Sequence, residues 1–213
     1  IGGLAVGMAV AMLIGLWVND ELSFDKYHKN YERIAQVMQH ANYNGKVETQ
    51  VSNPALMGPE LRNKYGDNFK YVVQSSWTGG HLLSVGDKHI AKVGTFFEPD
   101  APDMLSLKML KGTRAGLKDP YSIILSASAA ESIFGKDDPI NKVVKLDRNV
   151  DLKVTGVYED LPDNTSFRDT KIMMPWELWL IQNPWAKNMT EPWSSNFSQT
   201  FVQIADNTDM TKV

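Results

Sequence analysis

Few residues in this chain have the types and the spacing that chemistry needs. Ser23 and Lys26 match the Ser-x-x-Lys spacing in which a lysine activates a serine nucleophile. The companion motifs of that chemistry are missing and the pair follows an apolar run, so a helix cap beside a solvated lysine is the better interpretation. Asp137 and Asp138 stand between a glycine and a proline, where adjacent carboxylates of a turn are solvated.

Metal, nucleotide and covalent chemistry have no stronger candidates. The sequence contains no Walker A, GxGxxG, HExxH or GxSxG pattern and no cysteine. Its histidines have no metal-ligand spacing among themselves, so we expect each at the surface or in a hairpin. They are His28, His40, His81 and His89. We therefore predict no catalytic residue, no metal site, no cofactor and no enzymatic activity of the chain by itself.

Residues 171–193 are unusually rich in tryptophan. Exposed indole rings stack on sugars or lie at membrane interfaces. Trp176 and Trp179 are therefore candidate contacts with a ligand or an interface. Tryptophan is also highly buried on average, which favours the alternative that these rings pack the core.

An uncharged apolar run opens the chain. At helical rise, residues 1–18 span about 27 Å, close to the hydrocarbon thickness of a bilayer. Trp17 stands at the far end of this run, where an amphipathic ring favours the interface. Acidic residues follow at once, and a signal peptide would need a basic segment before the run. The sequence predicts a transmembrane helix over 1–18 with the following domain outside the cytoplasm.

Small residues recur at every fourth position of this span. Gly3, Gly7, Ala11 and Gly15 line one stripe of a helix, and such stripes let two transmembrane backbones approach closely. We expect helix–helix packing there. Beyond the span, apolar residues at helical spacing predict that the helix continues as a stalk over 19–33.

The rest of the chain has a globular composition. Of all residues, 43% are hydrophobic and 22% are charged, and the net charge is −3. No basic tract occurs, so nucleic acid is excluded as an expected partner. The chain begins inside an apolar run without a methionine, so we expect it to be part of a longer protein.

Turn signals separate short strands along this part of the chain. Two-residue hairpin signals stand at 44–45 and 86–87, and a further turn is predicted at 147–149. A strand over 122–125 leads into a short helix, which the capping box Ser128–Glu131 predicts to begin at Ser128. Hairpin-linked strands mixed with short helices predict the α+β class.

An ordered series of segments resembles the FtsX/MacB-type ABC transporter permeases, in the versions that carry a MacB-like periplasmic core domain. The apolar helix runs into NDELSFDKYHKNYERIAQV, and further similar segments follow in order along nearly the whole chain. They are SNPALMGPEL, VGTFFEPD, SIILSASAAESIFGKDDPINKVVKLD and LKVTGVYEDLPDNTSF. Asn141 departs from the pattern, because the family often has glycine there.

The resemblance implies the architecture of the domain. Such permeases have four membrane helices and a two-lobed extracytoplasmic α+β domain between the first two, with a porter-like lobe and an inserted lobe. This chain would then hold a transmembrane helix at 1–18, a helical stalk at 19–33 and the periplasmic core domain at 34–213, cut at its C-terminal end.

The resemblance also implies the setting. The chain would be a permease subunit in the bacterial inner membrane, with its main domain in the periplasm and in contact with membrane lipid. Its partners would be an ABC ATPase, a second permease copy in a homodimer or heterodimer, and in some systems a periplasmic adaptor protein. Its function would be to couple ATP hydrolysis to export or mechanotransmission. A membrane-tethered module that binds glycan or protein is the main alternative, and a membrane-anchored hydrolase without a known motif is a third.

Overall fold

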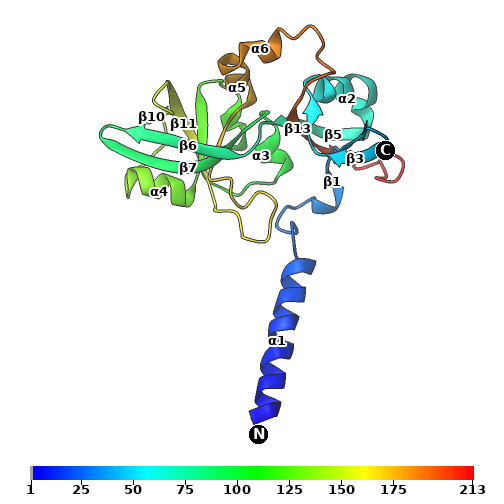
Figure 1. Ribbon diagram of the computed structural model, residues 1–213. Helices are drawn as coiled ribbons and strands as arrows, with labels where there is room; N and C mark the ends of the chain where they lie inside the picture. The colour runs from blue at the N-terminus through cyan, green and yellow to red at the C-terminus, as the bar shows by residue number, and fades with distance from the viewer. Residues whose placement is uncertain (1) are drawn as a thin grey trace.

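A long helix carries a mixed α/β domain in the computed structural model, which describes residues 2–213 (Figure 1). Helix α1 (Gly2–Leu22) projects from the domain with no buried residue, and it is long and apolar enough to cross a membrane. The predicted apolar helix is confirmed, although it ends at Leu22 rather than at Val18. Ile1, the first residue of the predicted span, lies outside the described residues.

The prediction of a helical stalk over 19–33 is wrong. After Leu22 the chain forms turns, and only the short 3-10 helix η1 (Tyr31–Arg33) follows. Asp25 has a φ of 60°, and its N–H donates to the Asn164 carbonyl at 2.8 Å. The Asn164 carbonyl thus takes the place of the Glu21 carbonyl, which the Asp25 N–H would bind if the helix continued.

One mixed sheet frames the domain. Its strands lie in the order β1-β13-β5-β7-β12-β9-β11-β10-β6, with β4 beside β13 and β8 beside β11. The bounds are β1 (Ile34–Gln36), β4 (Asn53–Pro54), β5 (Phe69–Ser75), β6 (Gly79–Val85), β7 (Lys88–Phe97), β8 (Met109–Gly112), β9 (Ser122–Ser126), β10 (Val143–Leu146), β11 (Val150–Tyr158), β12 (Ile172–Pro175) and β13 (Asn196–Ile204). A separate hairpin pairs β2 (Gln39–Tyr43) with β3 (Lys46–Gln50).

Short helices cover this sheet. They are α2 (Met57–Tyr65), η2 (Gly66–Asn68), α3 (Ala101–Met104), η3 (Arg114–Leu117), α4 (Ala127–Phe134), α5 (Trp176–Gln182) and α6 (Pro184–Lys187).

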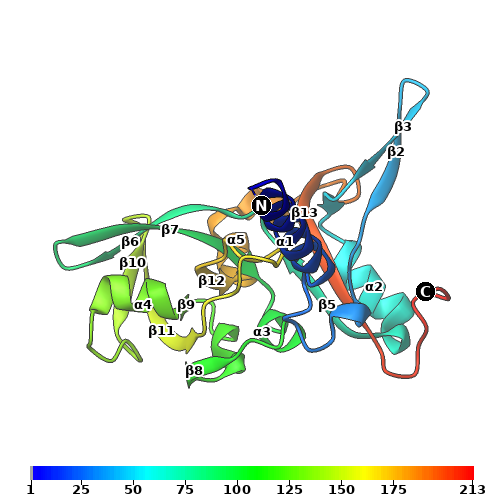
Figure 2. The same ribbon diagram turned by 90° about the horizontal axis from the view of Figure 1, so that it is seen from below.

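Two lobes lie on either side of α1 when the molecule is viewed along that helix (Figure 2). The smaller lobe holds β1, β5, β13, α2 and the β2–β3 hairpin, and the larger lobe holds β6 to β12 with α3, α4 and α5. The sheet passes from one lobe to the other where β5 meets β7, and these strands pair only at Ser75 and Phe97. The predicted α+β fold with two lobes is confirmed.

The larger lobe has a core on each face of the sheet. Ile123 and Leu125 pack with α4 and α5, whereas Ile124 packs with α3 and η3 on the opposite face. Successive side chains of a strand point to opposite faces, so a fully apolar strand feeds both cores. This burial holds β9 and β12 in the middle of the lobe.

The predicted hairpin turns are confirmed. Asn44 and Gly45 have φ values of 52° and 83°, and Asp147 and Arg148 have values of 48° and 61°. The two-residue loop at Asn44–Gly45 is of the type that needs positive φ at both central residues, which asparagine and glycine tolerate best. The β10–β11 loop has three residues, 147–149, since Leu146 pairs with Val150.

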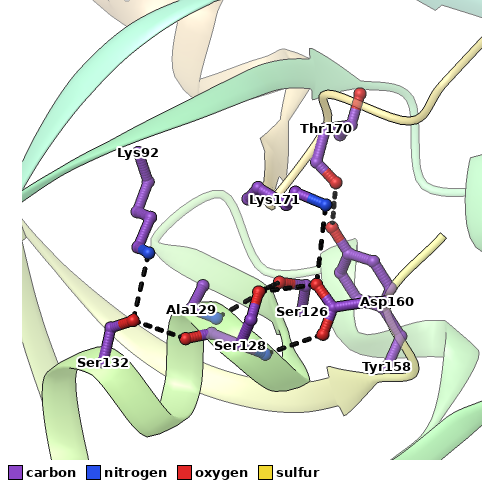
Figure 3. Close-up of polar contacts among 9 residues, drawn as sticks. All are labelled: Lys92, Ser126, Ser128, Ala129, Ser132, Tyr158, Asp160, Thr170 and Lys171. Carbon is purple, nitrogen blue, oxygen red and sulfur yellow. Dashed lines mark hydrogen bonds and ion pairs between the residues drawn. The ribbon is translucent and has the colours of Figure 1, made fainter. Parts of the chain in front are cut away.

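The predicted capping box at Ser128 is wrong, because α4 begins earlier. Ser126 is the N-cap, and its hydroxyl accepts a hydrogen bond from the Ala129 N–H at 3.2 Å (Figure 3). The Ser128 N–H and hydroxyl instead donate to the Asp160 carboxylate at 2.8 and 2.6 Å. Lys171 pairs with the same carboxylate at 3.6 Å. The N-terminus of α4 is therefore satisfied by the local Ser126 hydroxyl together with the Asp160 carboxylate, which follows a neighbouring strand.

Candidate functional site at the helix exit

Asp25 fastens the exit of α1 to the larger lobe. Its carboxylate accepts hydrogen bonds from the Thr165 hydroxyl at 2.6 Å, the Ser166 N–H at 2.8 Å and the Ser166 hydroxyl at 2.7 Å. The Asn164 side chain donates to the Ser23 hydroxyl at 2.9 Å. The loop that supplies these donors, 163–167, reaches toward the exit of α1 (Figure 1). We call this cluster of Asp25, His28 and residues 164–167 the exit clamp.

His28 is the buried member of the exit clamp, with only 2% of its surface exposed. Its Nδ1 lies 2.7 Å from the Leu105 carbonyl oxygen and its Nε2 lies 2.9 Å from the Thr165 hydroxyl oxygen. The imidazole also meets the Phe167 ring edge-on at 5.6 Å. The expectation that His28 lies at the surface or in a hairpin is wrong, because the turns after Leu22 fold it into the lobe.

When His28 is neutral, the exit clamp lacks one of the hydrogens that its three contacts need. A carbonyl and a carboxylate can only accept, so they demand Nδ1–H from His28 and the hydroxyl hydrogen from Thr165. The remaining contact, between Nε2 and the Thr165 oxygen, then has no hydrogen. A proton on Nε2 would complete it, so the clamp has room for one proton more than it holds in the neutral form.

Two opposing effects set the charges of the clamp. Burial lowers the pKa of His28 below its ordinary value, although the Leu105 carbonyl and the Asp25 charge act in the other direction. Burial raises the pKa of Asp25, but the hydrogen bonds from Thr165 and Ser166 outweigh it and leave the pKa below its ordinary value. At neutral pH the clamp therefore holds a carboxylate and a neutral imidazole.

Ser23 and Lys26 lie at this junction but are used separately. The Ser23 hydroxyl donates to the Asp20 carbonyl at 3.0 Å, and the Lys26 ammonium lies 6.0 Å from the centre of the Tyr31 ring. Within residues 2–213, no group of three or more His, Cys, Asp or Glu side chains is placed to hold a metal ion.

The tryptophan segment is built from stacked rings. Trp176 is 6% exposed and stacks on Trp179 with ring centres 4.7 Å apart and planes inclined by 4°. Trp179 stacks in turn on Phe197 at 5.3 Å. Trp176 also lines a cleft of about 390 Å³ near α2, so a ligand contact at Trp176 or Trp179 stays a prediction. The rings that face solvent are Trp185 and Trp193, which the sequence did not single out as contacts.

The small-residue stripe of α1 is free within this chain. Gly3, Gly7, Ala11 and Gly15 are all exposed. Nothing lies within 4 Å of the position that a Cβ would take at the three glycines, among the residues that the structure describes. Packing of this stripe against another helix therefore stays a prediction.

The exit clamp joins two segments that the family resemblance already contained. SFDKYH and DNTSF are separated by 140 residues between Asp25 and Thr165, and nothing in their spacing relates them. The sequence signal was only that both carry short polar side chains beside a phenylalanine. Their contact needed the tertiary structure.

Known structures share this fold. A domain of a putative permease protein from Porphyromonas gingivalis is 16% identical, with a TM-score of 0.67 over 87% of this chain and 78% of that one. The periplasmic region of MacB from Actinobacillus actinomycetemcomitans is 17% identical, with a TM-score of 0.60 over 84% and 78%. The extracellular domain of the noncanonic ABC-type transporter YknZ from Gram-positive bacteria is 15% identical, with a TM-score of 0.58 over 82% and 84%.

Sequence comparison places the chain in a family. No curated protein matches the sequence. The family model described as the MacB-like periplasmic core domain matches residues 1–213, which is the whole chain. With an apolar helix leading into a two-lobed domain that shares the fold of the MacB periplasmic region, this chain belongs to the MacB-like periplasmic core domain family of ABC transporter permeases.

Proposed function

We propose that the chain transmits motion from a cytoplasmic ABC ATPase to the periplasm, as part of a permease in the bacterial inner membrane. The work done there would be export or mechanotransmission. The family supports the class of protein, and the exit clamp is the observation that carries the proposal. A tether would need no such attachment, because a flexible linker holds a domain to a membrane equally well.

The exit clamp can deliver motion to both lobes. Phe167 follows the residues that bind Asp25, and its ring lies 6.2 Å from that of Phe97 and 5.3 Å from that of Phe201. Phe97 ends β7 and Phe201 belongs to β13, so one ring contacts strands of the larger and of the smaller lobe. A tilt of α1 would thus act on the seam between the lobes.

The seam itself is suited to a hinge. Strands β5 and β7 pair at one position, Ser75 with Phe97, whereas β5 pairs with β13 along most of its length. Two backbone hydrogen bonds flank this pair, from the Ser76 N–H to the Phe96 carbonyl at 2.9 Å and from the Glu98 N–H to the Gln74 carbonyl at 3.0 Å. One buried apolar cluster also crosses the seam, so the lobes would move against each other by small shifts of packed side chains. A tilt of α1 that reaches Phe97 through Phe167 would therefore rotate the lobes against each other.

The test measures motion in the full permease with its ATPase in membranes. Spin labels are placed at Leu22→Cys on α1 and at Lys136→Cys on the larger lobe, after replacement of any cysteine outside this chain, which itself has none. We expect the label-to-label distance to change between the nucleotide-free and the trapped ATP-bound state. Asp25→Ala should abolish that change while ATP hydrolysis continues, and Asp20→Ala, an exposed aspartate of α1, is the control.

A distance change that survives Asp25→Ala would contradict the clamp as the route of motion. A distance that does not respond to nucleotide even in the unaltered protein would favour the membrane-tethered binding module instead.

We further propose that the chain is not an enzyme by itself and that it works with a second permease copy. No phosphate-binding loop occurs in the sequence, and the free stripe of α1 suits close helix packing. ATP hydrolysis by the purified chain above background would contradict the first statement. Gly7→Leu with Ala11→Leu should weaken subunit cross-linking in membranes, and unchanged cross-linking would contradict the second.

A further inference from the structure

A small cleft of about 160 Å³ lies where the two lobes meet. Its floor is one face of the sheet, as the strand register shows. Ser75 lies opposite Gln199 in β13 and opposite Phe97 in β7, and Gln36 lies opposite Phe201. Opposed residues of antiparallel strands have side chains on the same face, so all five point into the cleft that they line.

Hydroxyl and amide groups dominate the polar part of this cleft. Ser75 is fully buried, and its hydroxyl has no hydrogen-bond partner among the described residues. Thr78 and Thr95 share one hydrogen bond of 2.8 Å, so each keeps further capacity. Gln36 and Gln199 add two amides to the lining. A buried hydroxyl without a partner costs free energy unless something enters to bind it.

Three phenylalanine rings supply the apolar part. Phe97 and Phe201 belong to the floor, and Phe167 reaches over them from the loop of the exit clamp. No lysine, arginine, histidine, aspartate or glutamate is among the described residues that line the cleft. A charged ligand would lose its hydration there without meeting an opposite charge, so the cleft suits a neutral one.

We propose that this cleft binds a single neutral sugar residue. Hydroxyls and amides that both donate and accept match the hydroxyls of a sugar, and aromatic rings cover the C–H face of its ring. The volume corresponds to about five water molecules at roughly 30 Å³ each, below the roughly 300–1,000 Å³ of sites for larger ligands. The site therefore takes one ring rather than a chain of them.

A sugar bound in the cleft would restrict movement at the hinge between the lobes. The sugar would contact Ser75 and Phe97, the single pair that joins β5 to β7, and Phe167 of the exit clamp. The bound ring would hold the two lobes in their present arrangement. The binding site goes beyond the proposed function and does not depend on it, because binding needs neither nucleotide nor an ATPase.

The test is saturation-transfer NMR on the whole chain in lipid nanodiscs with glucose as the probe. Maltoside detergents are avoided because their headgroups are sugars. We expect transfer to the sugar ring at millimolar concentration. Ser75→Ala should weaken the affinity of the cleft for the sugar about two- to tenfold, which corresponds to the loss of one neutral hydrogen bond. Ser194→Ala removes an exposed hydroxyl far along the chain and should leave the affinity unchanged.

Folding does not confound this variant. Ser75→Ala removes a buried hydroxyl that has no partner among the described residues, so the melting temperature should stay the same or rise. Glucosamine, which has the same ring with a cationic amine, should bind at least several-fold more weakly.

Three results would overturn the proposal. The first is the absence of transfer from the unaltered chain. The second is an affinity that Ser75→Ala does not change, or that Trp185→Ala abolishes, since the sugar would then lie on the exposed tryptophan segment. The third is equal binding of glucosamine, which would contradict the neutral character of the site.

Discussion

The exit clamp and the tryptophan segment both join the larger lobe to other parts of the molecule, but by different kinds of contact. The clamp joins residues 140 positions apart through hydrogen bonds to one carboxylate. The tryptophan segment stacks rings that lie within a short stretch of chain, from Trp176 to Phe197. Stacked rings contribute mainly buried area, which is insensitive to direction. Hydrogen bonds to a carboxylate depend on direction, so the clamp suits the transmission of motion and the rings suit stability.

The largest effect should come from breaking the stacked rings. Trp176→Ala removes a 6%-exposed indole from the core and should cost about 3–5 kcal/mol of unfolding free energy. Urea unfolding of the chain, followed by circular dichroism, measures the loss. Trp185→Ala removes an indole that is 52% exposed and is the matched control. An equal cost at both positions would contradict the distinction between the packed and the exposed rings.

Breaking the clamp should have a smaller and more local effect. Asp25→Ala removes three hydrogen bonds to a half-buried carboxylate and should cost about 2 kcal/mol. The amide of Ser166 loses its acceptor, so its hydrogen exchange should accelerate. Exchange in β9, in the middle of the larger lobe, should change little. Uniform acceleration across the lobe would mean that the clamp is part of the core.

Acid should loosen the clamp before it affects the stacked rings. The pKa of His28 lies below its ordinary value in the folded protein, so the unfolded chain binds the proton more readily. Neutral His28 therefore contributes fully to the stability of the fold at pH values above about 6.5, the pKa of histidine in an unfolded chain. This contribution is lost as the pH falls below that value. The lowered pKa of Asp25 adds a second loss below about pH 3.9.

The measurement is the melting temperature between pH 5 and pH 7. His28→Gln should flatten the fall in this range, and His40→Gln in the exposed β2–β3 hairpin is the control. A pH profile that His28→Gln leaves unaltered would show that this imidazole does not titrate with folding.

The smallest effect is expected from the ion pair beside the tryptophan rings. Lys187 contacts Glu177 at 2.6 Å, but both side chains are largely exposed. Lys187→Ala should therefore cost about 0–1 kcal/mol in the same urea experiment. A larger cost would mean that charge, and not ring stacking, holds this segment.

The local turns and the apolar helix could be predicted because each depends on neighbouring residues. Asn44–Gly45 forms a two-residue hairpin turn because asparagine and glycine are among the few residue types that tolerate positive φ. Alternation over β10 and β11 also identified core positions such as Leu146 and Leu152, which are fully buried. The start of α4 was misplaced because Ser128 bonds Asp160, a residue that the local pattern cannot include.

The candidate sites were the hardest to predict. Ser23 and Lys26 had a suggestive spacing but serve separate contacts, whereas His28 had no pattern and is the buried centre of the clamp. The cleft at Ser75 could not be predicted from the sequence, because its polar residues are spread over four strands and two loops.

By itself, the sequence determined an apolar helix, the α+β class, the hairpins and the family resemblance, since periodicity and turn chemistry are encoded within a few residues. Only the tertiary structure decided where α1 ends and what its exit contacts. A helix can end where its last backbone groups and the side chains that follow find hydrogen-bond partners outside the helix. For Asp25 that partner is the loop at 164–166, and chain distance carries no information about contacts made across a folded domain.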